Sequence, residues 1–267
     1  MMLWRCLVVG LCLIGSVEGF SVTASTEPRT NCLLFSANGA GEQYLECTTV
    51  DENSVYTQEL LELAASYDRG YGASPSARRR AMEVIQKLEA CNTEFNASRG
   101  IEGDSMTRSP LTGNWRMIWT TALDVLSLQA SPLFTAGAIY QVFEPPIVTN
   151  VIDFLPRAQT LLPPDLVPNT LFRARVQTRA CERPNRPNRI GLVFERVQFQ
   201  PLQVLGLDFD FVPPVALDLP RIFNIDQTDE NAPGFFDVSY LDSSLLIIRQ
   251  NDPGGLFALV KVDSIEA

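Results

Sequence analysis

The 267-residue sequence contains no histidine. Histidine is the commonest general base and the commonest metal ligand at neutral pH. Its absence excludes catalysis that depends on an imidazole, including Ser-His-Asp and Cys-His arrangements. Chemistry by a carboxylate, a lysine or a cysteine stays open. Because no catalytic constellation is present, we predict that the protein is not an enzyme, and we predict neither a cofactor nor a metal site.

Lysine is almost absent as well. Lys87 and Lys261 are the only two lysines among 21 basic residues, the other 19 (21 − 2) being arginines, and the net charge is −10. A chain this acidic is not expected to bind a phosphate backbone, so nucleic acid is not a predicted partner. The sequence leaves the oligomeric state undetermined.

Cysteine is scarce and scattered. Two of the six cysteines lie within the first 19 residues. The other four lack the CxxC spacing of a zinc site, and one or two disulfides stay open if the compartment is oxidising. These four are Cys32, Cys47, Cys91 and Cys181.

Residues 1–19 have the pattern of a secretory signal peptide. Arg5 supplies the positive charge, residues 7–14 form a short apolar stretch, and the segment ends in the small residue Gly19. The apolar stretch is too short to cross a bilayer comfortably. A retained membrane anchor is the alternative.

Residues 20–56 change the predicted destination. Phe20 is followed by a stretch rich in serine and threonine. This resembles the bipartite presequences of algae with secondary plastids, in which a Phe-led transit peptide follows a signal peptide. We therefore predict a plastid transit peptide and disordered linker here, and a plastid localisation reached through the ER. Simple secretion is the rival prediction.

Residues 57–98 are predicted to form a helical lead-in. Apolar residues recur at helical spacing over 57–67. Ser74-Pro75 has the pattern of an N-cap with a first-turn proline, which predicts a second helix over 77–95.

Residues 99–267 change to short apolar or alternating runs separated by turn residues. Over 170–179, Phe172 and Ala174 point to one face and Arg173 to the other. Short strands after a helical start predict a mainly β fold, an antiparallel barrel packed by one or two N-terminal helices, with 57–267 as one domain. The predicted strands are 114–121, 139–143, 147–154, 170–179, 190–199, 235–241, 245–249 and 256–262.

Gly113 and Trp115 open the first predicted strand with a Gly-x-Trp pattern. Lipocalins begin their barrel in this way, since the indole plugs the closed end and the glycine lets the chain enter tightly beside it. An arginine from the last strands often stacks on that tryptophan. We therefore predict a lipocalin-like barrel with a structural pair of Trp115 and Arg249.

Longer motifs at both ends of the predicted barrel resemble the plastid lipid-associated, or fibrillin, family. Residues 111–121 read LTGNWRMIWTT, and residues 240–257 contain Tyr-Leu-Asp, Ile-Ile-Arg and Gly-Leu-Phe in the order of the family's closing segment. Residues 60–61, 88–92, 138–141 and Asn150 extend the resemblance to about 57–263. Departures stand at Leu246, Gln250 and Ala258, so one cation of the family's closing segment is missing.

The resemblance implies a lipid-associated protein of plastoglobules or thylakoid surfaces, which binds, carries or coats prenylquinones, carotenoids or acyl lipids. A small barrel holds one hydrophobic ligand in an apolar interior. The side chains predicted to line that interior are Trp115, Trp119, Tyr140, Phe172, Phe194, Tyr240 and Phe257.

Two further segments bear on lipid contact. Six arginines within seventeen residues predict either a basic patch for a membrane surface or a solvated hairpin. Residues 202–223 are dense in apolar residues and proline, and either line the barrel mouth and dip into lipid or, as we prefer, pack over the barrel. The six arginines are Arg173, Arg175, Arg179, Arg183, Arg186 and Arg189.

Two other functions stay open. The first is an enzyme acting on a carotenoid or quinone, for which Asp208, Asp210 and Asp218 are the carboxylates nearest the apolar segment, and Asp208 and Asp210 brought close could share a proton. A secreted lipocalin-like carrier would share the fold and differ only in its address.

Overall fold

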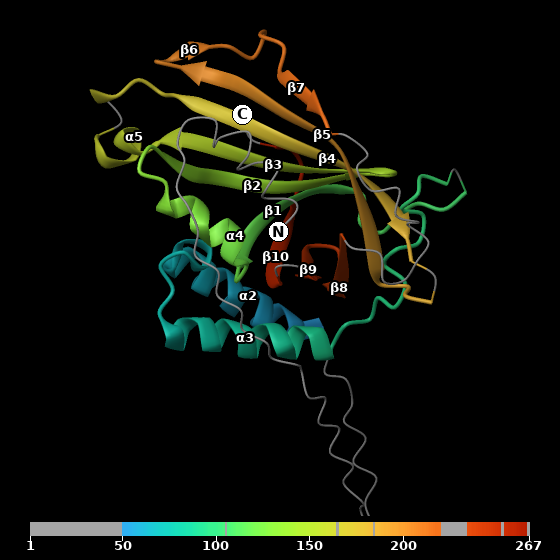
Figure 1. Cartoon of the computed structure of the whole chain (residues 1–267). Helices are drawn as coiled ribbons and strands as arrows, with labels where there is room; N and C mark the ends of the chain where they lie inside the picture. The colour runs from blue at the N-terminus through green and yellow to red at the C-terminus, as the bar shows by residue number, and fades with distance from the viewer. Residues whose placement is uncertain are drawn as a thin grey trace, which may run out of the picture.

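The computed structural model describes residues 50–104, 106–163, 166–183, 185–219, 234–251 and 254–265 (Figure 1). The predicted signal peptide and residues 20–49 of the predicted transit peptide and linker lie outside these residues, whereas residues 50–56 of that predicted linker form the start of a helix. Within them, no helix is both long and apolar enough to cross a membrane.

Along the chain, two long helices come first and the strands of the barrel follow. Helix α2 spans Val50–Ser66, which starts earlier than the predicted lead-in, and α3 spans Pro75–Ala90 after the short turn η2 (Asp68–Gly70). The predicted cap is confirmed, since the Ser74 hydroxyl accepts a hydrogen bond from the Ala77 amide. Shorter helical segments are α4 (Leu123–Leu126), η3 (Ser127–Ala130) and α5 (Arg157–Leu161).

Eight strands form a closed antiparallel barrel, which confirms the predicted lipocalin-like fold. Neighbours pair in the order β4-β3-β2-β1-β10-β9-β8-β5, and β5 closes the ring by pairing with β4. The strands are β1 (Gly113–Thr120), β2 (Phe134–Glu144), β3 (Ile147–Pro156), β4 (Leu171–Glu182), β5 (Arg189–Val204), β8 (Phe235–Leu241), β9 (Leu245–Gln250) and β10 (Gly255–Val262).

All eight predicted strands are present, and two of them, β2 and β5, extend at least five residues beyond their predicted bounds. Strand β2 begins at Phe134, five residues before the predicted start. The sequence does not reveal this part of the strand, because a bulge between Ala136 and Ile139 interrupts the alternation of side chains. Strand β5 continues to Val204 through Pro201, which a sequence pattern would place outside a strand.

Strand β5 leaves the barrel halfway along its length. Only its first residues, 189–191, pair with β8, whereas residues 196–199 pair with β7 (Val215–Asp218) and 203–204 pair with β6 (Leu207–Asp208). Residues 196–204 with β6 and β7 are called the projecting sheet. In Figure 1 it forms the part of the molecule farthest from α2 and α3.

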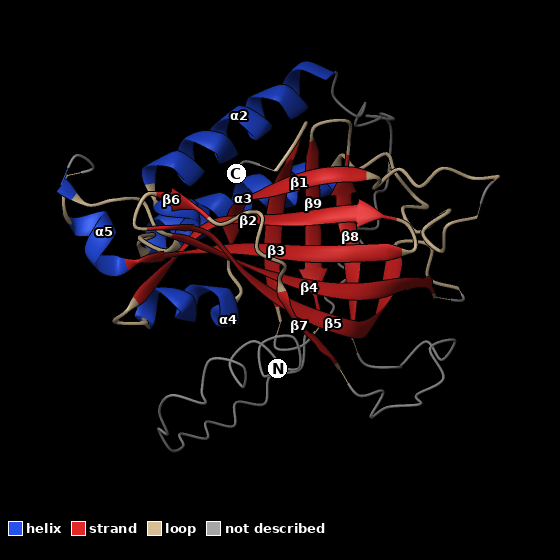
Figure 2. Cartoon of the chain, turned by 90° about the horizontal axis from the view of Figure 1, so that it is seen from above, coloured by secondary structure: helices blue, strands red, loops and turns tan. Residues whose placement is uncertain are grey.

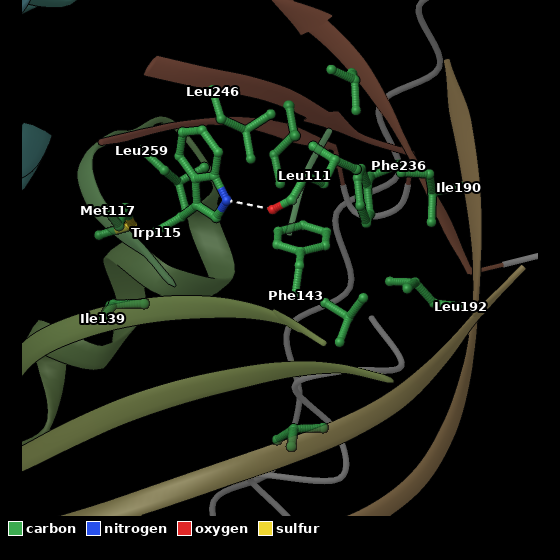
Figure 3. Close-up of a cluster of buried hydrophobic side chains, with 14 of the residues drawn as sticks. Leu111, Trp115, Met117, Ile139, Phe143, Ile190, Leu192, Phe236, Leu246 and Leu259 are labelled. Carbon is green, nitrogen blue, oxygen red and sulfur yellow. Dashed lines mark hydrogen bonds between the residues drawn. The ribbon is translucent and has the colours of Figure 1, made fainter. Parts of the chain in front are cut away.

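A hydrophobic cluster fills the barrel interior with side chains from every barrel strand. Figure 3 shows Trp115, Leu111, Phe143 and Phe236 converging near the start of β1, where the Trp115 indole donates a 2.7 Å hydrogen bond to the Leu111 carbonyl. The buried indole therefore plugs this end, as the Gly-x-Trp pattern predicts.

The predicted Trp115–Arg249 pair was wrong. The cation over the Trp115 ring is Lys261, at 5.1 Å. Arg249 instead forms two 2.7 Å hydrogen bonds with the Glu89 carboxylate of α3, and this partner raises the pKa of Arg249. The motif arginine thus fastens the helix to the barrel.

Helices α2 and α3 cover the outer face of β8, β9, β10 and β1, which we call the helix-covered wall. A second cluster joins Leu60, Ile85 and Leu88 of the helices to Trp119 and Ile247 of the strands, all fully buried. Each such side chain contributes about 1.5–3 kcal/mol when it leaves water. The apolar outer face of this wall is thereby sealed.

Candidate functional site

The barrel interior continues outward onto the projecting sheet without a break. In the strand register Ala174 of β4 faces Phe199 of β5, which faces Val215 of β7. Directly opposed residues lie on one face of a sheet. Since Ala174 belongs to the interior cluster, the row runs from the buried core to Val215, whose side chain is 75% exposed.

A parallel row and an aromatic stack complete this apolar face. Val176, Val197 and Leu217 face each other in the same way, from buried to exposed. Phe199 stacks on Phe172 with ring centroids 5.6 Å apart. We call the end of the barrel away from Trp115 the open end. One wall of this end is therefore continuously apolar.

Large apolar side chains also project from the loops around this end. Figure 2 shows α4, α5 and β6 together at the same end of the barrel. Seven large apolar side chains at this end are between 50% and 77% exposed. On most protein surfaces, exposed apolar side chains are scattered singly and are not gathered in this way. These residues, called the apolar rim, are Leu133, Leu161, Leu162, Leu166, Leu205, Leu207 and Phe211.

Polar side chains fix the rim segments to one another. The Gln159 amide donates to the Asn169 side chain at 2.7 Å, and Asn169 donates to the Gln203 side chain at 3.0 Å. Gln203 in turn donates to Asp208 at 2.9 Å. These hydrogen bonds connect four segments, namely α5, the loop that precedes β4, strand β5 and strand β6. The segments that carry the rim residues are therefore held in fixed positions.

A buried polar network holds the rim from the outer face of the sheet. Arg173 and Asp153 are each about 5% exposed and form a two-point ion pair at 2.6 and 2.9 Å. Beside it, Arg175 donates to Gln200, which donates to the carbonyls of Asp210 and Val212. Burial and then the Arg173 charge lower the pKa of Arg175. The network fixes the loop that presents Phe211.

The predicted interior residues separate into two groups. Trp115 is buried in the interior cluster, and Phe172, Phe194 and Phe257 are partly buried and pack against it. Their role in ligand binding stays a prediction. Trp119, Tyr140 and Tyr240 were wrongly placed, because they lie in clusters outside the barrel.

Bulges explain two of these errors. The register shifts between Met117 and Trp119 in β1 and between Val238 and Tyr240 in β8. One extra residue reverses the alternation, so the aromatic side chain after each bulge, Trp119 or Tyr240, turns toward the helices. Sequence spacing alone contains no signal for these shifts.

The predicted basic patch does not form, because most of its arginines are engaged inside the protein. Arg173 and Arg183 are buried. Arg179 pairs with Glu195, and Arg189 pairs with Asp237 while lying 3.8 Å from the centre of the Phe235 ring. Arg175 donates to Gln200, and of the six only Arg179 and Arg186 are exposed.

The apolar segment after residue 202 does not pack over the barrel as we preferred. Leu205, Leu207 and Phe211 are exposed, although the part beyond residue 219 lies outside the described residues. The carboxylates of the enzymatic alternative are exposed as well: Asp208 accepts a hydrogen bond from Gln203, and Asp218 pairs with Arg196 at 2.5 Å.

One functional candidate escaped the sequence analysis. The Tyr71 ring packs against the interior cluster, and its buried hydroxyl has no hydrogen-bond partner within the described part of the chain. Burial raises the pKa of Tyr71 to about 12, so the group stays neutral. No cluster of histidine, cysteine, aspartate or glutamate suited to a metal ion occurs among the described residues.

The motif residues at the two ends of the barrel have structural tasks. The Tyr240 hydroxyl donates to Asp242, whose other oxygen accepts from the Ser244 and Leu245 amides and so fixes the β8–β9 turn. Gly255 has φ +141°, and a Cβ there would lie 2.6 Å from Ala122. These residues maintain the barrel.

Comparison with known proteins agrees with this architecture. Residues 54–260 match the family model described as PAP_fibrillin. The chain is 24% identical over 293 residues to the probable plastid-lipid-associated protein 10, chloroplastic, of Arabidopsis thaliana, covering 98% of this chain and 97% of that protein. It is also 24% identical to the probable plastid-lipid-associated protein 3, chloroplastic, of Oryza sativa subsp. japonica, over 77% of this chain and 58% of that protein. No solved structure matches the chain.

Proposed function

Because the chain belongs to the PAP_fibrillin family, we propose that it is a plastid lipid-associated protein that contacts hydrophobic lipid through the open end of its barrel. The observation that carries the proposal is the continuous apolar wall from Ala174 to Val215, flanked by the apolar rim. Exposed apolar patches of this kind mark lipid or partner contacts. The chloroplastic relatives support a plastid address.

The geometry favours contact with a lipid assembly or with an apolar molecule that enters from it. The rim residues are exposed, while Phe172, Phe194 and Phe257 are partly buried and pack against the interior cluster. An acyl or isoprenoid chain lying against this wall would gain about 0.8 kcal/mol for each methylene removed from water. Association with plastoglobules or thylakoids, and carriage of prenylquinones, carotenoids or acyl lipids, belong to this proposal.

The test is flotation of the tagged protein with lipid bodies and membranes from lysed plastids, followed by mass spectrometry of the lipid that copurifies. The variant Leu205→Ser/Leu207→Ser/Phe211→Ser removes three rim side chains and is expected to shift the protein to the soluble fraction. Its matched control is Phe95→Ser/Met106→Ser, which removes two equally exposed apolar side chains near the opposite end. Soluble wild-type protein without bound lipid, or equal flotation of both variants, contradicts the proposal.

A further inference from the structure

The open end carries apolar side chains but no basic ones in the segments that project from it. Residues 127–135, 158–171 and 197–219 contain no lysine or arginine. Proteins that dock on anionic membranes place lysine and arginine next to their apolar contacts, and each cation near such a surface is worth about 1 kcal/mol. This end lacks that device.

The charges that do stand at the rim are carboxylates. Asp208 and Asp210 are exposed and alternate in sequence with the rim residues Leu207 and Phe211. Asp218, at the end of β7, is also exposed and is neutralised by Arg196. Two negative charges therefore stand unopposed among the side chains that would enter a lipid surface first.

The arginines nearest to this end are turned to other partners. Arg157 donates to the carbonyls of Gln129 and Ser131, and Arg173 is buried in its pair with Asp153. Arg175 donates to Gln200. Arg173 is buried and the other two are half-buried, and each donates to a partner other than Asp208 or Asp210.

From this arrangement we propose that the apolar rim docks on lipid surfaces with uncharged head groups, and that Asp208 and Asp210 select against anionic ones. The inference rests on the proposed function and specifies the lipid class that the same site accepts. Apolar contact supplies the attraction, and the carboxylates add a repulsion that acts only where the surface is negative. A lipid assembly of uncharged head groups meets the rim without this repulsion.

Vesicle binding tests the proposal with the mature protein purified from cells through a C-terminal tag. Phosphatidylcholine vesicles are the uncharged probe, and the same vesicles with added phosphatidylglycerol are the anionic probe. At about 1 kcal/mol each, two carboxylates predict about thirtyfold weaker binding to the anionic vesicles at low salt, and a smaller ratio as salt is raised. The isosteric variant Asp208→Asn/Asp210→Asn is expected to bind both vesicles alike, without a change in melting temperature.

The matched control is Glu144→Gln/Asp263→Asn, which removes two exposed carboxylates where β2 and β10 end, away from the rim. It keeps the wild-type preference for uncharged vesicles if the rim charges are responsible. Equal or stronger binding of wild-type protein to anionic vesicles overturns the selectivity while leaving the lipid contact intact. No binding to either vesicle overturns the proposed function itself. Sedimentation that shows the rim to be covered by a second copy of the chain also overturns the proposal.

Discussion

The two walls of this barrel have the same kind of side chain on their surfaces but different covers. The helix-covered wall turns Trp119 and Ile247 outward, and α2 and α3 seal them. The projecting sheet and its rim present Val215, Leu217 and Phe211 with no such cover from the described residues. The helices make the first wall part of the hydrophobic core. In the second wall, hydrogen bonds and ion pairs such as Arg173–Asp153 hold the strands in place, while the apolar side chains remain exposed. This difference between the two walls is the basis of the lipid contact proposed above.

The largest expected effect tests the polar anchor of the projecting sheet. Asp153→Asn leaves the buried Arg173 charge without its carboxylate, which should lower the free energy of unfolding by about 3–5 kcal/mol. Urea unfolding measures it. Glu195→Gln, which breaks the exposed pair with Arg179, is the control and should cost less than about 1 kcal/mol. Similar losses in the two variants would show that the inner network is no anchor.

A second pair of substitutions compares the walls directly. Ile85→Ala opens a cavity under α3 and should lower stability by about 2–5 kcal/mol. Leu207→Ala removes an exposed rim side chain and should change stability by less than about 0.5 kcal/mol. Thermal and urea unfolding give both values. If Leu207→Ala were as costly as Ile85→Ala, the rim would be packed core and the comparison would fail.

Two tyrosine hydroxyls differ in their hydrogen bonding: that of Tyr240 donates to Asp242, whereas that of Tyr71 is buried without a partner among the described residues. Tyr71→Phe removes a buried donor without a described partner and should raise the free energy of unfolding by about 1 kcal/mol. Tyr240→Phe removes the hydrogen bond to Asp242 and should lower it by a similar amount. A loss in both variants would show that Tyr71 has a partner, such as a bound water or ligand.

The smallest effect concerns acid stability near the β4–β5 turn. The Arg99 guanidinium, by a side-chain hydrogen bond, lowers the pKa of Glu94 below 4.5. A carboxyl group with a lowered folded pKa stabilises the fold above its unfolded pKa, and this contribution is lost as the pH falls through the folded value. Glu94→Gln should therefore flatten the loss of stability below about pH 4.5. If the stability of Glu94→Gln measured by urea unfolding depended on pH as in the wild type, Glu94 would not contribute to the loss of stability in acid.

Much of the fold was accessible from the pattern of the chain. Alternation in 170–179 predicted β4 with Phe172 and Ala174 inward and Arg173 outward, which the structure confirms. The Ser74-Pro75 cap and the eight strands were predicted for the same reason, since local periodicity and turn residues are local properties. The bulges beside Trp119 and Tyr240 were not predicted, because a single extra residue leaves no trace in composition.

The candidate site was less accessible. The sequence marked the six arginines as a surface patch, and tertiary partners such as Asp153 and Asp237, distant in the chain, engage two of them. It also marked the segment after residue 202 as apolar but could not tell whether Leu205 and Phe211 are covered. Cover depends on which elements meet in space, and this is a property of the assembled barrel.

The sequence by itself determined the class of the protein: a helical lead-in, an antiparallel barrel opened by Gly113 and Trp115, no imidazole chemistry, and membership of a lipid-associated family. The tertiary structure decided which apolar residues are core and which are surface. The physical reason is that strand β5 outruns its neighbour β8, so its second half, with β7, carries the interior face of the barrel out into solvent. The absence of lysine and arginine from residues 127–135, 158–171 and 197–219 is visible in the sequence, but only the tertiary structure shows that these segments meet at one end of the barrel.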